Sequence, residues 1–199
     1  GQCVQNFVEA VKYTFKGNVT FKSVVSQAAK IGFDSLGISL MIVLIASSVI
    51  ALQVSKQFLL SGAEDYIGGF LGVALIREIA PGFAALAIGA RAGTAITAQI
   101  ANMKVTSQVD AMKVLGVNPI GYYFAPRIIA GAFGVMFVVI LAEFIGVLGG
   151  MAVSYFSISL HPNRYINSVW LMFNTKDIYI SVLKGFVFGA IISTVCATV

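Results

Sequence analysis

The sequence predicts an all-α polytopic membrane protein, with an N-terminal interfacial amphipathic helix followed by a transmembrane helix bundle. Hydrophobic residues make up 58% of the 199 residues and charged residues only 11%, and the mean hydropathy is +0.92. Soluble domains carry roughly 25% charged residues, so this chain has too little polar surface for a water-soluble globule of its size. Several of its apolar stretches also reach the length of about 20 residues that crosses a bilayer.

Residues 1–30 are predicted to form amphipathic helices that lie in the membrane interface. Apolar side chains recur there at helical spacing, and the lysines lie off the apolar stripe. Helices of this kind lie in the interface plane rather than spanning it, although a helix packed on a cytosolic partner has the same pattern. The stripe consists of Val4, Phe7, Val8, Val11 and Phe15, and it resumes at Phe21, Val24, Val25 and Ala28.

Four apolar stretches follow the N-terminal segment. The first, residues 35–55, contains no charged residue. The second, residues 66–103, is too long for one untilted span, so it is either one helix kinked near Pro81 or a tight hairpin. The other two stretches are residues 120–156 and 178–199, and the polar segments between the four are residues 56–65, 104–119 and 157–177.

The distribution of basic residues predicts the orientation of the spans. Residues 1–34 carry four lysines and residues 104–127 carry three basic residues, whereas residues 56–65 and 157–177 carry one and two. The positive-inside rule therefore places the N-terminal segment and residues 104–127 on the cytoplasmic side. Because both of these segments are cytoplasmic and residues 35–55 cross the membrane once, residues 66–103 must also cross it once. Lipid headgroups explain the net charge of +5, so no nucleic-acid partner is expected.

Glycine pairs at small-xxx-small spacing recur within the predicted spans. Such pairs let helix backbones approach closely. Their number predicts a tightly packed bundle with a subunit interface. The four pairs are Gly68/Gly72, Gly89/Gly93, Gly146/Gly150 and Gly185/Gly189.

Charged residues within the second apolar stretch are candidates for function. A charge at the bilayer centre costs about 2.5–3.5 kcal/mol on insertion scales. Arg77 and Glu78 are adjacent, so their side chains do not face each other and each needs its own partner. Arg91 falls on nearly the same helical face as Arg77. Glu78 is expected to line a cavity or a subunit interface, and the alternative is an ion-pair network that only holds the bundle together.

Two further charges lie within the later apolar stretches. Lys184 is close enough to Asp177, about 10 Å along a helix, to extend its ammonium group toward the interface. Glu143 lies deeper, which predicts a pair with Lys184 or an arginine. The predicted buried charge network consists of Arg77, Arg91, Glu143 and Lys184.

Residues 105–117 are predicted to form a short amphipathic helix on the cytoplasmic side. Thr106 or Ser107 can cap its start, with Ser107 and Asp110 spaced as in a capping box. Gly116 suits the position just past the helix end. A helix between two spans is where a transporter docks a motor subunit, although a helix on the membrane surface has the same pattern.

The sequence indicates a transport subunit rather than an enzyme. One histidine, His161, and two cysteines near opposite ends, Cys3 and Cys196, exclude a Cys/His metal cluster and a disulfide framework. No G-x-x-x-x-G-K-[ST] motif occurs, so this chain does not bind ATP by a P-loop. No bound cofactor is expected, and active transport would draw its energy from another chain or an ion gradient.

A specific combination of motifs lies between Leu75 and Pro119. The motifs are Arg77-Glu78-Ile79-Ala80-Pro81, Gly89-Ala90-Arg91-Ala92-Gly93, Thr106-Ser107-Gln108-Val109-Asp110-Ala111-Met112 and Gly116-Val117-Asn118-Pro119. Together they resemble the MlaE/YrbE permease family, the membrane subunits of ABC transporters that move phospholipids with MCE-domain partner proteins. Weaker similarity extends as far as Lys184. Ser107 departs from the family pattern, which often has an acidic residue there.

The resemblance implies five spans in the complete fold, about four of them here, with residues 31–199 as a permease domain that stops before the last span. It implies a homodimer with a lipid cavity between protomers on the periplasmic side, an MCE-domain partner, and a P-loop ATPase subunit that holds ATP and Mg²⁺. The residues expected near the lipid pocket are Leu75, Ile76, Glu78 and Ile79. The residues expected on the coupling helix that docks on the ATPase are Thr106, Ser107, Gln108, Asp110 and Met112.

The expected function is therefore phospholipid transport between membranes by an ABC transporter. The expected location is a bacterial inner membrane or, alternatively, a plastid inner envelope. An ion-coupled secondary transporter with Glu78 and Glu143 as proton sites is the alternative function. A membrane scaffold that transports nothing would leave the buried charges unexplained.

Overall fold

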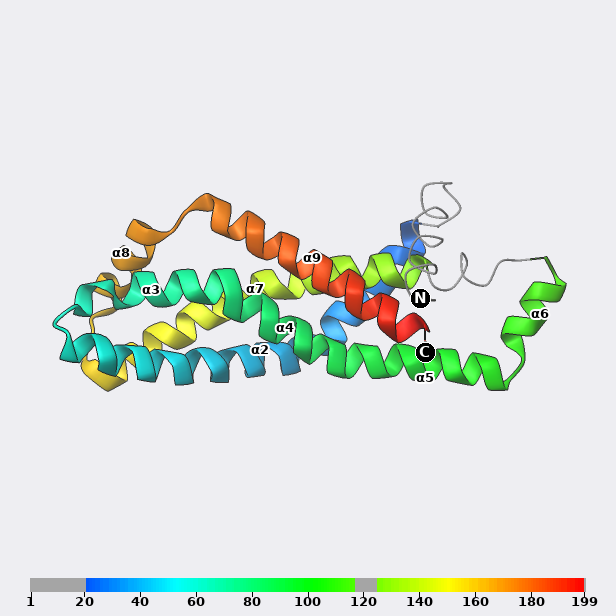
Figure 1. Cartoon of the computed structure of the whole chain (residues 1–199), viewed down its shortest axis with the longest axis horizontal. Helices are drawn as coiled ribbons and strands as arrows, with labels where there is room; N and C mark the ends of the chain where they lie inside the picture. Colours follow the sequence, from blue (N-terminus) through cyan, green and yellow to red (C-terminus); the bar gives the residue numbers. More distant parts are fainter. Residues whose placement is uncertain (1–20, 117–124, 199) are drawn as a thin grey trace. The chain divides into compact units, whose positions relative to one another are not determined.

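The structure is a computed structural model that describes residues 21–116 and 125–198. Within these ranges every regular element is a helix and none is a strand, which confirms the predicted all-α class. Figure 1 follows the helices along the chain. Four of them are long and apolar enough to cross a membrane: Val24–Leu60, Glu64–Val105, Ala125–Ile158 and Thr175–Ala197.

The first long helix, α2 (Phe21–Leu60), begins earlier than the predicted span. It contains no proline, and its two glycines, Gly32 and Gly37, stand singly, so nothing in the sequence breaks it at residue 30. Residues 21–30 are therefore continuous with the span and are not a separate element. Residues 1–20, which hold most of the predicted interfacial helix, lie outside the described residues.

The second long helix runs from Glu64 to Val105 as a single piece, so the predicted single helix is confirmed and the hairpin is excluded. Two π-helical turns widen it, η2 (Leu75–Ile79) and η3 (Gly89–Gly93). η2 ends two residues before Pro81, which has no N–H for the carbonyl four residues back. The other parts are η1 (Glu64–Tyr66), α3 (Ile67–Ala74), α4 (Ala80–Ile88) and α5 (Thr94–Val105).

A short helix, α6 (Gln108–Val114), occupies the place predicted for residues 105–117. Its start differs from the predicted cap. The Thr106 hydroxyl donates to the Asn102 carbonyl at 2.8 Å and so belongs to the end of α5, and Ser107 has a φ of 56°, outside the extended region of an N-cap. Gly116 has a φ of 74°, as its predicted place after the helix requires.

The segment 157–177 is not the polar loop that the sequence predicted, because it contains α8 (Pro162–Met172). His161 caps this helix, with its Nδ1 accepting the Asn163 N–H at 3.4 Å. Pro162 stands in the first turn, where a missing N–H costs no helical hydrogen bond. Along the chain, α8 follows α7 (Ala125–Ile158) and precedes α9 (Thr175–Thr198).

The chain divides into two compact units. The first unit comprises Gly1–Ser35, Leu86–Phe137 and Phe186–Val199, and the second comprises Leu36–Ala85 and Val138–Gly185.

In the second unit, α2 packs closely on α7 through small side chains. Every fourth residue of α2 from Ser39 to Ser55 is fully buried, and four of these five are serine or alanine. A Cβ on Gly149 would lie 3.1 Å from the Ser47 hydroxyl, and the Ser55 and Ser154 hydroxyls are hydrogen-bonded at 3.2 Å. Small residues thus allow the two helix backbones to approach closely, and the Ser55 and Ser154 hydroxyls give each other a hydrogen-bond partner.

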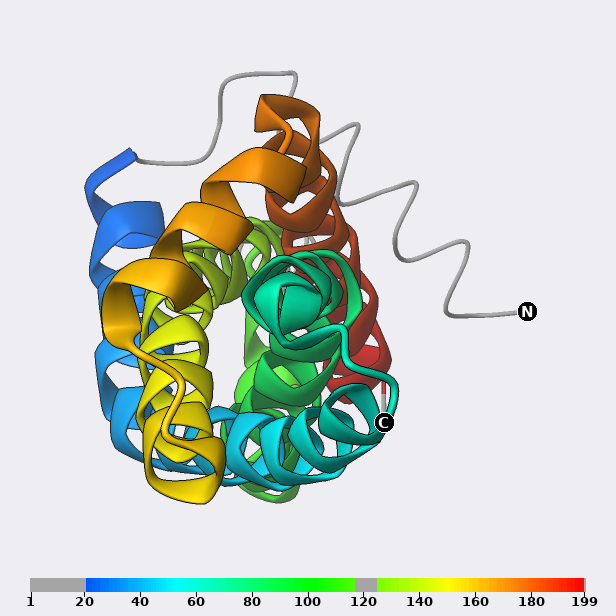
Figure 2. The ribbon, with the colours of Figure 1, turned by 90° about the vertical axis from the view of Figure 1, so that its left-hand side faces the viewer.

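Also in the second unit, α8 packs on α3 (Figure 2). Gly68 contacts the backbone of Tyr165, whose side chain is 1% exposed and lies in the core beside Leu71. The Gly69 N–H, in the first turn of α3, donates to the Ser168 hydroxyl at 2.9 Å. Ser168 therefore satisfies one of the backbone donors that a helix start leaves unpaired.

Most glycines of the predicted pairs pack inside the chain, as the predicted tightly packed bundle requires, and the predicted subunit interface stays a prediction. Gly68 and Gly72 receive α8 in the second unit. In the first unit, Gly93 receives the Cys196 side chain of α9, and Gly189 lies against the backbone of Gly131. The pair Gly146/Gly150 likewise contacts side chains of the second unit.

Gly68→Ala tests the contact between α3 and α8. The new Cβ would fall on the Tyr165 carbonyl, which is backbone and cannot rotate away. We expect a loss of about 1–3 kcal/mol in unfolding free energy, as for other overpacked sites, measured by denaturant titration in detergent. Gly37→Ala is the matched control, because no atom lies within 4 Å of its Cβ. Equal stability of the two variants would contradict this packing.

Candidate functional site

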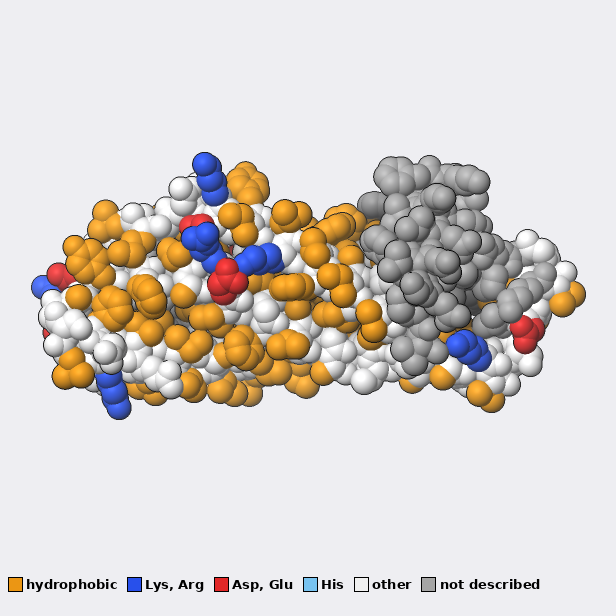
Figure 3. Space-filling view, viewed as in Figure 1, with side chains coloured by type: hydrophobic (Ala, Val, Ile, Leu, Met, Phe, Trp, Pro, Cys, Tyr) orange, Lys and Arg blue, Asp and Glu red, His pale blue; other side chains and the backbone are white. Residues whose placement is uncertain are grey.

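Two charged pairs join η2 to α9 in the second unit. The Lys184 ammonium lies 2.7 Å from Glu78 Oε1, and Arg77 Nε lies 3.4 Å from Asp177 Oδ1. Asp177 and Lys184 are about two turns apart on α9, so they share one face of that helix. The adjacent charges of η2 thus each have a partner of their own. Figure 3 shows basic and acidic side chains gathered on a largely hydrophobic surface.

Lys184 also compensates for Pro81. In a regular helix the carbonyl of Arg77 would accept the N–H of residue 81, and proline has none. Lys184 Nζ donates to this carbonyl oxygen at 2.9 Å. One ammonium therefore binds both the orphaned carbonyl of Arg77 and the carboxylate of Glu78.

The partners differ in exposure. The Asp177 side chain is 10% exposed, whereas those of Arg77 and Glu78 are 49% and 71% exposed. Arg77 and Glu78 border a pocket of about 440 Å³ whose other walls are apolar or glycine: Gly69, Phe70, Val73, Ala74 and Met172. The site thus places charge beside apolar surface, an arrangement that suits an amphiphilic ligand.

The other residues predicted for the substrate pathway lie elsewhere. Leu75 is fully buried in the core. Ile76 lines a different, apolar pocket of about 300 Å³, and Ile79 is partly buried. Of the four predicted residues, only Glu78 lines the charged pocket, and these roles stay predictions.

Glu143 lies at the apolar pocket that Ile76 lines. Its side chain is buried, and its carboxylate accepts a hydrogen bond from the hydroxyl group of Ser181, which is buried on α9. In the part of the chain that the structure describes, Ser181 is the partner of Glu143, in place of the predicted Lys184 or arginine.

The predicted four-residue charge network is therefore divided. Lys184 and Arg77 meet in the second unit through the Arg77 carbonyl, and Glu143 has a separate partner there. Arg91 belongs to the first unit, where it lines a pocket with residues of α2. Among the described residues, no group of three His, Cys, Asp or Glu side chains is placed to hold a metal ion.

Sequence reasoning missed two partners on α9. The sequence places Asp177 at the end of a polar segment, although its spacing from Lys184 puts both on one helical face. Ser181 gave no signal, because a single hydroxyl in an apolar helix is common.

The helix predicted to contact an ATPase presents an exposed surface. Thr106, Ser107, Gln108 and Asp110 are exposed and Met112 is partly buried. Large apolar side chains are exposed beside them: Val105, Val114 and Leu115.

Long apolar helices with paired charges define a multi-pass helical membrane protein with a polar site on its spans. The family model described as Permease MlaE matches residues 24–199. The chain therefore belongs to the MlaE permease family and is an ABC transporter permease, a class of subunit that works with an ATPase subunit.

Similar proteins come from bacteria and plants. A probable ABC transporter permease of Synechocystis sp. is 32% identical over 92% of this chain and 70% of its own length. A probable ABC transporter permease of Rickettsia typhi is 33% identical over 94% of this chain and 72% of its own. The chloroplastic protein TRIGALACTOSYLDIACYLGLYCEROL 1 of Arabidopsis thaliana is 28% identical over 94% of this chain and 53% of its own.

Lys184→Met tests the role of Lys184 at the orphaned carbonyl. We expect a loss of about 1 kcal/mol or more in unfolding free energy from the lost hydrogen bonds. Pro81→Ala restores a backbone donor, so the same change should cost less in a Pro81→Ala background. The free energies of unfolding in detergent of the parent, the two single variants and the double variant give this double-mutant cycle. Additive costs would show that Lys184 does not act through the Arg77 carbonyl.

Ser181→Ala tests the contact that holds Glu143. Removal of the hydroxyl leaves a buried carboxyl group without its partner, which costs about 1–3 kcal/mol. We expect a corresponding fall in unfolding free energy. Ser48→Ala, which loses one solvent-accessible hydroxyl bond to a backbone carbonyl, should change it little. A Ser181 variant as stable as the Ser48 variant would disprove the contact.

Proposed function

We propose that this permease moves phospholipids between membranes, with ATP and Mg²⁺ bound by a separate ATPase subunit. The observation that carries the proposal is the exposure of Glu78, 71% in its side chain. Glu78 lies about 20 Å along its helix from Glu64, well inside a candidate span. A charge that faces lipid tails there costs about 2.5–3.5 kcal/mol, so we infer that Glu78 lines a hydrated cavity or an interface.

The chemistry of the charged pocket suits a phospholipid. Arg77 and Glu78 can serve a charged headgroup, while Phe70, Val73 and Met172 offer apolar contacts for acyl chains. The Arabidopsis relative bears the name of a galactosylated diacylglycerol, which is also a lipid with two acyl chains. A cavity shared by two copies of the chain would cover the exposed charges, which supports the proposal of a homodimer.

The energetics of lipid transfer support an MCE-domain partner outside the membrane. A lipid with two acyl chains carries about 30 methylene groups, and exposing them to water costs roughly 24 kcal/mol at about 0.8 kcal/mol each. An apolar route must therefore continue beyond the permease. A bacterial inner membrane is the proposed location, and a plastid inner envelope is the alternative that the chloroplastic relative supports.

We assign the ATPase contact to α6. Its exposed residues Gln108, Asp110 and Val114, with Leu115 directly after the helix, form a surface that a soluble partner can cover. Membership in an ABC permease family favours this ATP-driven scheme over an ion-coupled carrier that uses Glu78 and Glu143.

Glu78→Ala tests the proposed pathway. We expect ATP-dependent transfer of labelled phospholipid from reconstituted vesicles to fall about tenfold or more, because the headgroup site loses its carboxylate and Lys184 loses its partner. Membrane insertion and unfolding midpoint should stay near those of the parent protein. Glu64→Gln, at the start of the same helix, is the control. Unchanged transfer by Glu78→Ala would make Glu78 structural.

The same vesicles discriminate the two sources of energy. Transfer that stops on ATP depletion, with the proton gradient held constant, fits the ABC scheme. Transfer that continues without ATP would establish the ion-coupled carrier instead.

A further inference from the structure

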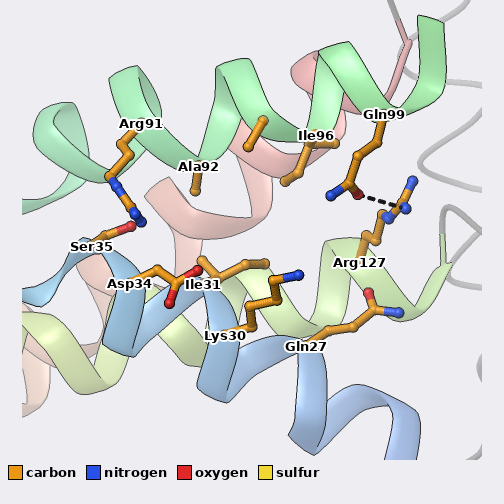
Figure 4. Close-up of a pocket in the computed structure, with 11 residues that line it drawn as sticks. Gln27, Lys30, Ile31, Asp34, Ser35, Arg91, Ala92, Ile96, Gln99 and Arg127 are labelled. Carbon is orange, nitrogen blue, oxygen red and sulfur yellow. Dashed lines mark hydrogen bonds between the residues drawn. The ribbon is translucent and has the colours of Figure 1, made fainter. Parts of the chain in front are cut away.

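A second polar pocket, of about 430 Å³, lies within the first unit. Three basic side chains line it, each from a different element: Lys30 of α2, Arg91 of η3 and Arg127 of α7. Figure 4 shows Lys30 and Arg91 extending into the space between these elements. Asp34 is the acidic residue of the lining, so three basic groups and one acidic group give a net formal charge of +2.

Arg127 is a fixed part of this pocket. It is 9% exposed, and its Nη2 donates to the Gln99 side-chain oxygen at 2.9 Å. Gln99 lies on α5, so this bond joins two elements and sets the plane of the guanidinium group (Figure 4). A guanidinium held in one plane is organised in advance for the oxygens of an anion.

Ser35 gives an independent sign of a ligand. It is fully buried, it lines the pocket, and its Oγ has no hydrogen-bond partner among the described residues. Buried hydroxyl groups nearly always have a partner. Figure 4 shows the Ser35 hydroxyl and the Arg91 guanidinium pointing toward one another, so one ligand oxygen placed there can serve both.

Two of the three basic side chains of the lining form no ion pair with another described residue. Within residues 21–116 and 125–198, neither Lys30 nor Arg91 forms an ion pair, and Asp34 forms none with them. Arginine and lysine bind phosphate oxygens through charge-assisted hydrogen bonds. Asp34 would repel a polyanion, so a ligand with a single phosphate group fits the lining best.

We propose that this pocket binds one phosphate group, carried by a phospholipid headgroup or by free inorganic phosphate. Lys30, Arg91 and the Ser35 hydroxyl donate to its oxygens, with Arg127 beside them. Asp34 can accept from a cationic substituent of the same headgroup. The proposal rests on residues of the first unit alone and does not depend on lipid transport through the Arg77–Glu78 site.

Site-specific cross-linking tests the lipid source. A photoreactive amino acid at Ala95, which lines the pocket, is introduced into the full-length protein in cells grown with radiolabelled phosphate. We expect a labelled lipid adduct that falls about tenfold in the Lys30→Gln/Arg91→Gln variant, as loss of charged hydrogen bonds implies. Lys56→Gln/Arg164→Gln, which removes two exposed basic residues elsewhere, is the matched control. Arg91→Lys should keep part of the adduct.

Thermal unfolding of the purified protein tests free phosphate. Inorganic phosphate should raise the unfolding midpoint over chloride at equal ionic strength, and Arg91→Gln should abolish the rise. Adducts without a phosphate effect identify a headgroup, and a phosphate effect without adducts identifies free phosphate. An adduct unchanged in the double variant, or the absence of both signals, would overturn the proposal. Lipid transfer is measured separately, so the two proposals can fail independently.

Discussion

Proline at residue 81 leaves the Arg77 carbonyl without its helical donor, and the arrangement of the second unit follows from how that oxygen is satisfied. Lys184 supplies the donor, so α9 must turn one face toward η2. The same ammonium then reaches Glu78, and Asp177, on the same face, reaches Arg77. A single backbone defect thus explains why two adjacent charges are tolerated in a long apolar helix.

Both π-helical turns of the second long helix coincide with its arginine motifs. η2 contains Arg77 and Glu78, and η3 contains Arg91. Turns of this type widen the backbone and are frequent at functional sites. The long helix therefore carries one polar site in each unit. Pro81 lies two residues after η2, and Gly89 and Gly93 are the end residues of η3.

Much of the fold could be predicted from the sequence, because apolar length alone identifies the four long helices, and the parity of basic residues favoured one kinked helix over a hairpin. Helix α8 could not be found in this way, since its polar composition resembles a loop and its packing depends on distant glycines such as Gly68. The charge partners were missed for a similar reason. Helical spacing shows which residues share a face, but not which face meets which neighbour.

The hydrogen bond between Gly69 and Ser168 has a consequence for the order of assembly. The two residues are 99 positions apart, so Ser168 is made only after all of α7 has been synthesised. Until then the first turn of α3 lacks this acceptor, and the glycines of α3 have no helix to pack against. The second unit therefore reaches its final packing late, because α8 and then the first part of α9 follow α7 along the chain.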